Sequence, residues 1–111
     1  MKDRNGLDLM VESIIRDRVQ RRILEVLLEE SKRNPTGFGV HRSDMKTALN
    51  IPEKAMDFNM KYLSIMNLVS YVPVPNFHWL WAKITGPGIA AIEDTLYYEQ
   101  LLTENKIGEH R

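Results

Sequence analysis

Residues 45–52 read MKTALNIP, residues 84–89 read ITGPGI, and the stretch from Met45 to Ile92 that contains both decides the fold. Its apolar spacing and turn residues predict, in order, a helix, a tight turn, a second helix, two short strands and a further helix. A compact unit with this order is typical of domains that place the second helix in a groove of duplex DNA.

The first helix of this unit is expected over residues 42–49, with His41 or Ser43 as its cap. The turn that follows is Asn-Ile-Pro at 50–52. Proline suits the first turn of a helix, because its missing N–H would have no partner there in any case. The second helix is therefore expected over residues 52–66.

The helix expected over 52–66 has two distinct faces. Met56, Met60 and Leu63 recur at i, i+4 and i+7, so these side chains would be buried. The other face would point outward and carries Glu53, Lys54, Asp57, Phe58 and Lys61.

A β-hairpin is expected over residues 68–84. A strand at 68–72 and a return strand at 77–84 flank a turn at 73–76, whose two prolines exclude it from the centre of a sheet. Side chains alternate between faces along a strand. Leu80, Ala82 and Ile84 would therefore face the core, and the outer face would carry Phe77, Trp79, Trp81 and Lys83.

The segments on either side of this unit complete a single domain. Periodic apolar residues predict helices at both ends, and the NPTGFG sequence at 34–39 predicts a loop. We expect a mostly α-helical domain with a small β-hairpin, of α+β class, over residues 7–104. Its expected parts are a disordered start at 1–6, a helix at 7–30, a loop at 31–40, a helix at 42–49, a helix at 52–66, a hairpin at 68–84, a Thr85-capped helix at 87–104 and a polar tail at 105–111.

Composition limits the classes of function that the chain can serve. The 111 residues are 43% apolar, which is enough for a core, and Lys+Arg and Asp+Glu are both 15. Many DNA-binding domains are basic, so zero net charge weighs against that function. Basic residues gather in the first half, however, and acids gather near the end.

Several other classes are excluded or unsupported. The absence of cysteine rules out disulfides, thiolate catalysis and cysteine-ligated zinc. No apolar run is long enough for a membrane span, and no secretion signal is recognisable at the start. We expect a cytoplasmic protein that is not inserted in a membrane.

Catalytic and metal-binding patterns are also missing from the sequence. The three histidines lack the spacing of a metal site, and the glycines of 37–39 lack the residues of a phosphate-binding loop. Neighbouring carboxylates, Glu29 with Glu30 and Glu93 with Asp94, lie on polar helix faces. We expect no metal, no cofactor and no enzymatic activity.

With these residues in view, the chain resembles the winged helix-turn-helix family over Met45 to Glu93. Residues 49–52 resemble the turn between the family's second and third helices. Residues 62–69 resemble the end of the recognition helix and the entry to the wing, with asparagine at 67 where glycine is common. Residues 83–89 resemble the exit from the wing. The expected architecture is a winged helix-turn-helix with helical extensions at its N- and C-terminal ends.

The resemblance implies a transcriptional regulator that binds duplex DNA as a homodimer. Carried over by position, the groove-reading residues would be Glu53, Lys54, Asp57, Phe58 and Lys61. Lys54 and Lys61 would contact phosphate or guanine, and Asp57 could accept from a cytosine amine. The DNA backbone contacts would come from Arg42 and Lys46 at the preceding helix, and Lys83 is the cation nearest to the wing tip at 73–77.

The aromatic residues of the return strand and the C-terminal helix suggest a subunit interface. Exposed apolar clusters of this size are uncommon in monomers, so either a second subunit or the N-terminal helix would cover them. We expect a homodimer built from the terminal helices. Its expected interface residues are Trp79, Trp81, Leu96, Tyr97 and Leu101.

A second function remains open, because winged-helix domains also serve as protein-interaction modules. The outward face of the second helix mixes acids with lysines around Phe58, and the wing tip at 73–77 has no Lys or Arg. Both features favour an adaptor that binds protein rather than DNA.

Overall fold

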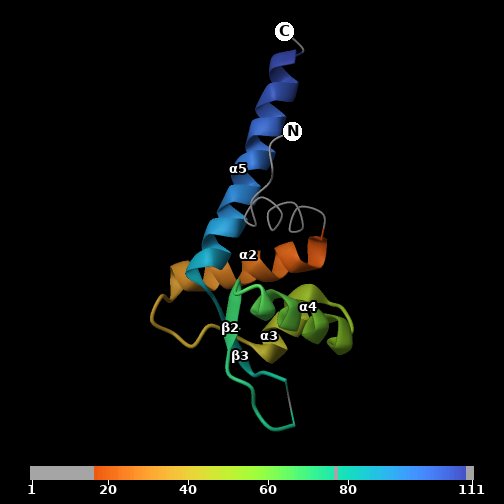
Figure 1. Cartoon of the computed structure of the whole chain (residues 1–111), viewed down its shortest axis with the longest axis vertical. Coiled ribbons are helices and arrows are strands. Elements are labelled where there is room, and N and C mark those ends of the chain that lie inside the picture. Colours follow the sequence, from red (N-terminus) through yellow and green to blue (C-terminus); the bar gives the residue numbers. More distant parts are fainter. Residues whose placement is uncertain (1–16, 77, 110–111) are drawn as a thin grey trace.

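The computed structural model describes residues 17–76 and 78–109, the last six of these as backbone only. Within these residues, seven elements follow one another, and Figure 1 shows their arrangement. They are α2 (Arg18–Arg33), β1 (Val40–His41), α3 (Arg42–Leu49), α4 (Glu53–Ile65), β2 (Val69–Tyr71), β3 (Trp81–Ile84) and α5 (Gly86–Glu109). The predicted α+β class, mostly helical with a small antiparallel sheet, is confirmed.

The elements form a compact body from which one helix projects (Figure 1). α2 lies across the body, α3 and α4 lie below it, and the wing loop between β2 and β3 hangs at the bottom. α5 rises from the opposite side of α2 and extends away from the body. Across the described residues, no helix is long and apolar enough to cross a membrane.

The core lies where α2 meets α4. Ile23, Leu24 and Leu27 repeat along one side of α2 and are almost completely buried. Met56, Met60 and Leu63, predicted as the inner face of the second helix, are fully buried against them. Helical spacing alone therefore identified the buried side of α4.

The sheet has three strands in the order β1-β3-β2, with both pairs antiparallel. β1 begins at the end of the segment predicted to be loop, and its pairing places Val40 opposite Ala82. Gly39 precedes it with φ of 98°, and a Cβ there would collide with the Ala82 carbonyl oxygen. Glycine is required at this position because the chain adopts a left-handed conformation while it passes close to β3.

The predicted alternation holds inside β3 and fails before it. Ala82 and Ile84 are buried while Trp81 and Lys83 are exposed, as expected. β3 begins only at Trp81, however, so Trp79 does not follow the pleat and its side chain is completely buried. The expectation that Trp79 faces outward as part of a subunit interface is therefore wrong.

The terminal helices differ from their expected limits. α2 begins after the N-cap Asp17 and runs to Arg33, three residues beyond the expected end at 30. α5 continues to Glu109, so residues 105–109 belong to the helix rather than to the polar tail expected at 105–111. The expected disordered start at 1–6, the first ten residues of the helix expected at 7–30, and Phe77 lie outside the described residues.

Local signals in the sequence set the other helix ends. The His41 ring accepts a hydrogen bond from the Ser43 backbone N–H at 3.1 Å, which confirms the expected cap of α3. Thr85 Oγ1 accepts from the Gly88 N–H at 3.0 Å at the start of α5. Asn67 has φ of 63°, the left-handed conformation that asparagine tolerates after a helix.

α5 packs on the body through a single stripe of its first half. Gly88, Ile92 and Thr95 lie at helical spacing on that stripe and are buried. Glu99, one turn further, receives a hydrogen bond of 2.6 Å from Arg21 Nη2 of α2. Beyond this ion pair the helix leaves the body (Figure 1).

Gly88 of α5 should not tolerate a methyl group. A Cβ at Gly88 would collide with the Leu68 carbonyl oxygen, so Gly88→Ala should destabilise the fold by roughly 1–3 kcal/mol. Gly86→Ala is the matched control, because nothing lies within 4 Å of a Cβ there. Urea unfolding measures both, and equal stability of the two variants would contradict this packing.

Candidate nucleic-acid interface

The outward side of α4 is a ridge of four residues: Lys54, Phe58, Lys61 and Ile65. They lie at i, i+4, i+7 and i+11, so they share one face of the helix opposite the buried methionines. All four are exposed, Phe58 by 71% and Ile65 by 74%. The ridge carries two positive charges and no negative charge.

The acids of α4 point away from this ridge because Arg42 pairs with them. Arg42 begins α3 and is largely buried. Its Nη2 donates to Asp57 Oδ2 at 2.8 Å, and its Nη1 forms a second bond with Asp57 Oδ1. Nη2 also lies 3.3 Å from Glu53 Oε2. Paired N–H bonds from one guanidinium to one carboxylate fix both the distance and the orientation of the two helices.

Trp79 adds a third element to this pair. Its indole Nε1 donates to Asp57 Oδ1 at 3.1 Å, and the Arg42 guanidinium lies 5.6 Å from the centroid of its ring. The segment before β3 is therefore fixed to α4 through the same carboxylate. We refer to Arg42, Asp57 and Trp79 together as the Arg42 cluster.

The cluster changes the protonation equilibrium of Asp57. Burial alone would raise the pKa of Asp57, but the hydrogen bonds and charge of Arg42, with the Trp79 N–H, outweigh burial and lower that pKa below its usual value. The hydrogen bond from Arg42 to Asp57 likewise raises the pKa of Arg42. Both groups are charged at neutral pH, and each compensates the other's loss of water.

The structure separates the predicted site residues into two groups. Lys54, Phe58 and Lys61 point outward as expected, whereas the Asp57 side chain is only 26% exposed and faces Arg42, so its expected outward orientation is wrong. Glu53 is 64% exposed but leans toward the same guanidinium. Ile65 was not predicted for this face, although it continues the spacing of the ridge.

The remaining predicted cations lie on neighbouring elements. Lys46 of α3 is half-buried and lines a groove that also includes His41 and Glu53. Lys83 is exposed on the outer face of β3, next in alternation to Trp81. The wing loop at 72–80 contains no Lys or Arg, and Val72 at its start is exposed.

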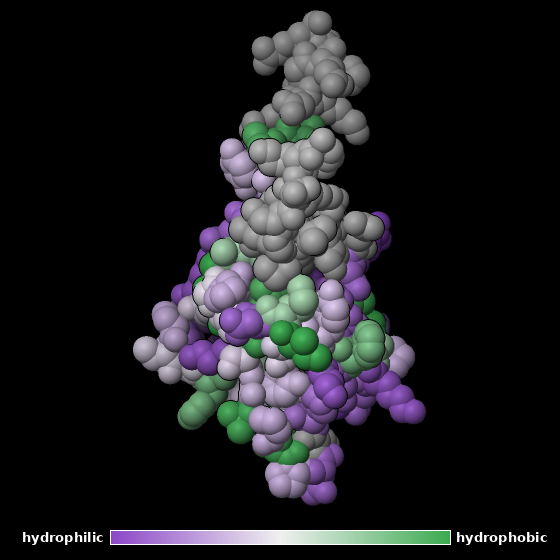
Figure 2. All heavy atoms as spheres, viewed as in Figure 1, coloured by the Kyte–Doolittle hydropathy of each residue, from purple (hydrophilic) through white to green (hydrophobic). Residues whose placement is uncertain are grey.

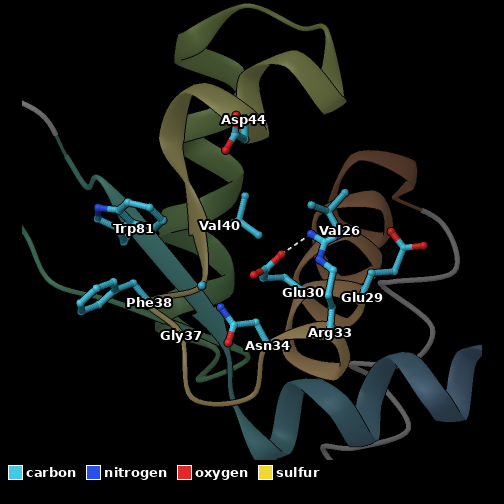
Figure 3. Close-up of a pocket in the computed structure, with 11 residues that line it drawn as sticks. Val26, Glu29, Glu30, Arg33, Asn34, Gly37, Phe38, Val40, Asp44 and Trp81 are labelled. Carbon is cyan, nitrogen blue, oxygen red and sulfur yellow. Dashed lines mark hydrogen bonds and ion pairs between the residues drawn. The ribbon is translucent and has the colours of Figure 1, made fainter.

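A second groove has a volume of about 590 Å³, and Figure 3 shows the side chains that line it. It is formed by α2, the loop at 34–39, β1, α3 and β3, and no residue of α4 lines it. Glu30 and Arg33 point toward one another and form an ion pair, while Glu29 and Asp44 add further carboxylates (Figure 3). Carboxylates repel phosphate, so this side of the molecule is unsuited to nucleic acid.

Apolar residues remain exposed along α5, where Leu96, Tyr97, Tyr98 and Leu102 all reach solvent and Leu101 is half-buried. Elsewhere, on the face that Figure 2 shows, hydrophobic residues are scattered among hydrophilic ones rather than gathered in one large patch.

Residues 17–76 and 78–109 contain no group of three or more His, Cys, Asp or Glu that could hold a metal ion.

Comparisons with known proteins agree with this architecture. No family model and no curated protein matches the chain. Two solved structures of MepR point mutants from S. aureus do match. The alignment with the first covers 93% of this chain and 72% of the MepR chain, with a TM-score of 0.68 and 16% sequence identity. The chain has a winged-helix fold.

The second match is a selenomethionine derivative of a MepR mutant from a multidrug-resistant S. aureus clinical isolate. The alignment covers 93% of this chain and 71% of that MepR chain, with a TM-score of 0.66 and 14% sequence identity. At this identity the likeness extends to the fold and to the order of the elements. The expected winged helix-turn-helix architecture is thereby confirmed.

Asp57→Asn removes the negative charge of the Arg42 cluster while keeping a side chain of nearly the same size. Loss of the carboxylate leaves a buried guanidinium poorly paired, which should cost roughly 1–3 kcal/mol at pH 7. Because the folded pKa of Asp57 is lowered, its stabilisation is complete above the unfolded value of about 3.9 and is lost as pH falls through the folded pKa. Asp57→Asn should therefore lose less stability than the wild type below about pH 4.

The control is Glu53→Gln, which removes the other carboxylate near Arg42. Glu53 is mostly exposed, so this change should cost less than about 1 kcal/mol. Urea unfolding from pH 7 to pH 2.5 measures both variants. If the free energy of unfolding fell in parallel with pH for the wild type and Asp57→Asn, the ion pair with Arg42 would not lower the pKa of Asp57, and this account would be wrong.

Proposed function

We propose that this winged-helix protein binds duplex DNA, with α4 in the major groove, and acts as a dimeric transcriptional regulator. The observation that carries the proposal is the ridge of α4, which presents Lys54 and Lys61 while the acids of the same helix are turned toward Arg42. A recognition helix needs a convex, phosphate-tolerant face, and this ridge provides one.

The other predicted contact residues take different roles in this proposal. Lys46 on α3 lines a groove beside the start of α4, and Lys83 is exposed on the outer face of β3; both would contact the DNA backbone. Arg42 and Asp57 would position α4 rather than touch DNA, because each already satisfies the other. Glu53 would stay beside Arg42 at the start of the helix.

A homodimer would use the exposed part of α5. Leu96, Tyr97 and Leu101 lie outside the stripe of α5 that packs on the body, and large side chains are favoured at interface centres. Trp81 is exposed on the sheet and is the second expected contact. Two copies joined in this way would present two α4 helices to successive turns of a palindromic site.

A protein-binding adaptor is the second candidate. The exposed Val72 on an uncharged wing and the exposed Phe58 on α4 favour it. A mobility shift on random-sequence duplex at low salt distinguishes the two functions, because a DNA-binding protein retards the duplex and an adaptor leaves it unshifted.

The double variant Lys54→Ala/Lys61→Ala should bind duplex DNA more weakly and with less salt dependence. Each lost phosphate contact should reduce the slope of log affinity against log salt concentration by about 0.9. The control Arg18→Ala/Lys32→Ala removes the same charge from exposed positions on α2. Fluorescence anisotropy over a salt series measures both, and equal slopes for all three proteins would rule out the ridge as the contact surface.

Sedimentation should find the wild type as a dimer at micromolar concentration. Tyr97→Glu/Leu101→Glu places two carboxylates in the expected interface and should yield a monomer of unchanged helix content. Ala90→Glu adds a carboxylate at an exposed position of α5 close to the body and should leave the dimer intact. A wild type that sediments as a monomer would contradict the proposed assembly.

A further inference from the structure

Phe58 occupies the centre of the α4 ridge, between its two lysines. Along the helix axis it lies about 6 Å from Lys54 and about 4.5 Å from Lys61, since each residue rises about 1.5 Å. Its side chain is 71% exposed, and the buried side of α4 is already filled by Met56, Met60 and Leu63. Phe58 therefore contributes little to the core and projects between two cations.

The chemistry of the side chain limits what it can recognise in a major groove. Phenylalanine has no hydrogen-bond donor or acceptor, so it cannot distinguish the polar edges of the bases. The apolar group in the groove is the 5-methyl of thymine, which phenylalanine can contact directly. Guanine and cytosine edges would instead lose water against the ring without a replacement partner.

The neighbouring charges hold the ring near the base edges. If Lys54 and Lys61 contact the backbone or guanine, the ring between them lies within about two base-pair steps of either contact, at about 3.4 Å a step. Phe58 also lies in the N-terminal half of α4, the half from which recognition helices reach base edges. Ile65 is equally exposed but ends the helix, so it lies beyond that half.

We propose that Phe58 contacts the 5-methyl group of a thymine and so makes an A·T pair preferred at one position of the DNA site. This inference rests on the proposed function, because it assumes that α4 enters the major groove. Phe58 would then determine sequence specificity, whereas Lys54 and Lys61 would supply mainly affinity.

The experiment begins with a site that the wild type selects from a randomised duplex pool. Each thymine is then replaced in turn by deoxyuridine, which removes only the methyl group. At one position the wild-type affinity should fall about fourfold, the effect of one buried methyl. Phe58→Ala should bind thymine and deoxyuridine duplexes equally at that position, and Phe58→Leu should retain part of the preference.

The matched control is Ile65→Ala, which removes an equally exposed apolar side chain and should keep the full preference. Thermal unfolding should show that both alanine variants remain folded, since neither side chain is buried. Binding by the wild type without discrimination at any thymine, or discrimination that survives in Phe58→Ala, would overturn the inference. Failure of the wild type to bind any duplex would instead overturn the proposed function.

Discussion

The bidentate ion pair between Arg42 and Asp57 determines where α4 lies. A buried guanidinium is tolerated only when its charge and N–H groups are paired, and here both oxygens of one carboxylate pair with it. The Trp79 indole N–H binds the same carboxylate. The start of α3, the middle of α4 and the segment before β3 are thereby held as one unit. A recognition surface needs this rigidity, because hydrogen bonds to base edges form only over donor–acceptor distances of about 2.7–3.2 Å.

The same ion pair explains how a chain with zero net charge can present a cationic surface. Composition counts 15 basic and 15 acidic residues but does not say which face each one occupies. Arg42 draws Asp57 and Glu53 to one side of α4, and Glu29 and Asp44 line a groove to which α4 contributes no residue. The ridge that remains carries Lys54 and Lys61. Surface potential depends on this placement rather than on the sum of charges.

Features that depend on neighbours in sequence were predicted well. The buried stripe of α4 and the caps at His41 and Thr85 all follow from residues within a few positions of one another. Features that depend on distant partners were missed. β1 has only two residues and exists because it pairs with β3 some forty positions later. Nothing in its own sequence, apart from the glycine before it, indicates a strand.

The candidate site shows the same limit. Lys54, Phe58 and Lys61 were correctly placed on the outward face because helical periodicity assigns faces. Asp57 lies on the same side of the helix by spacing, but its orientation depends on Arg42, 15 positions earlier, and on Trp79, 22 positions later. Trp79 was misplaced because strand alternation was extended past the first residue that pairs in the sheet.

The most direct test of the central claim is an NMR titration of the wild type with a short random-sequence duplex at low salt. Backbone amide shifts should concentrate at residues 53–61, with smaller shifts at Lys46 and Lys83, while residues 96–101 of α5 stay unchanged. Shifts centred on the acidic groove beside Phe38 and Trp81, or an unchanged spectrum, would contradict the assignment of α4 as the DNA-contacting element.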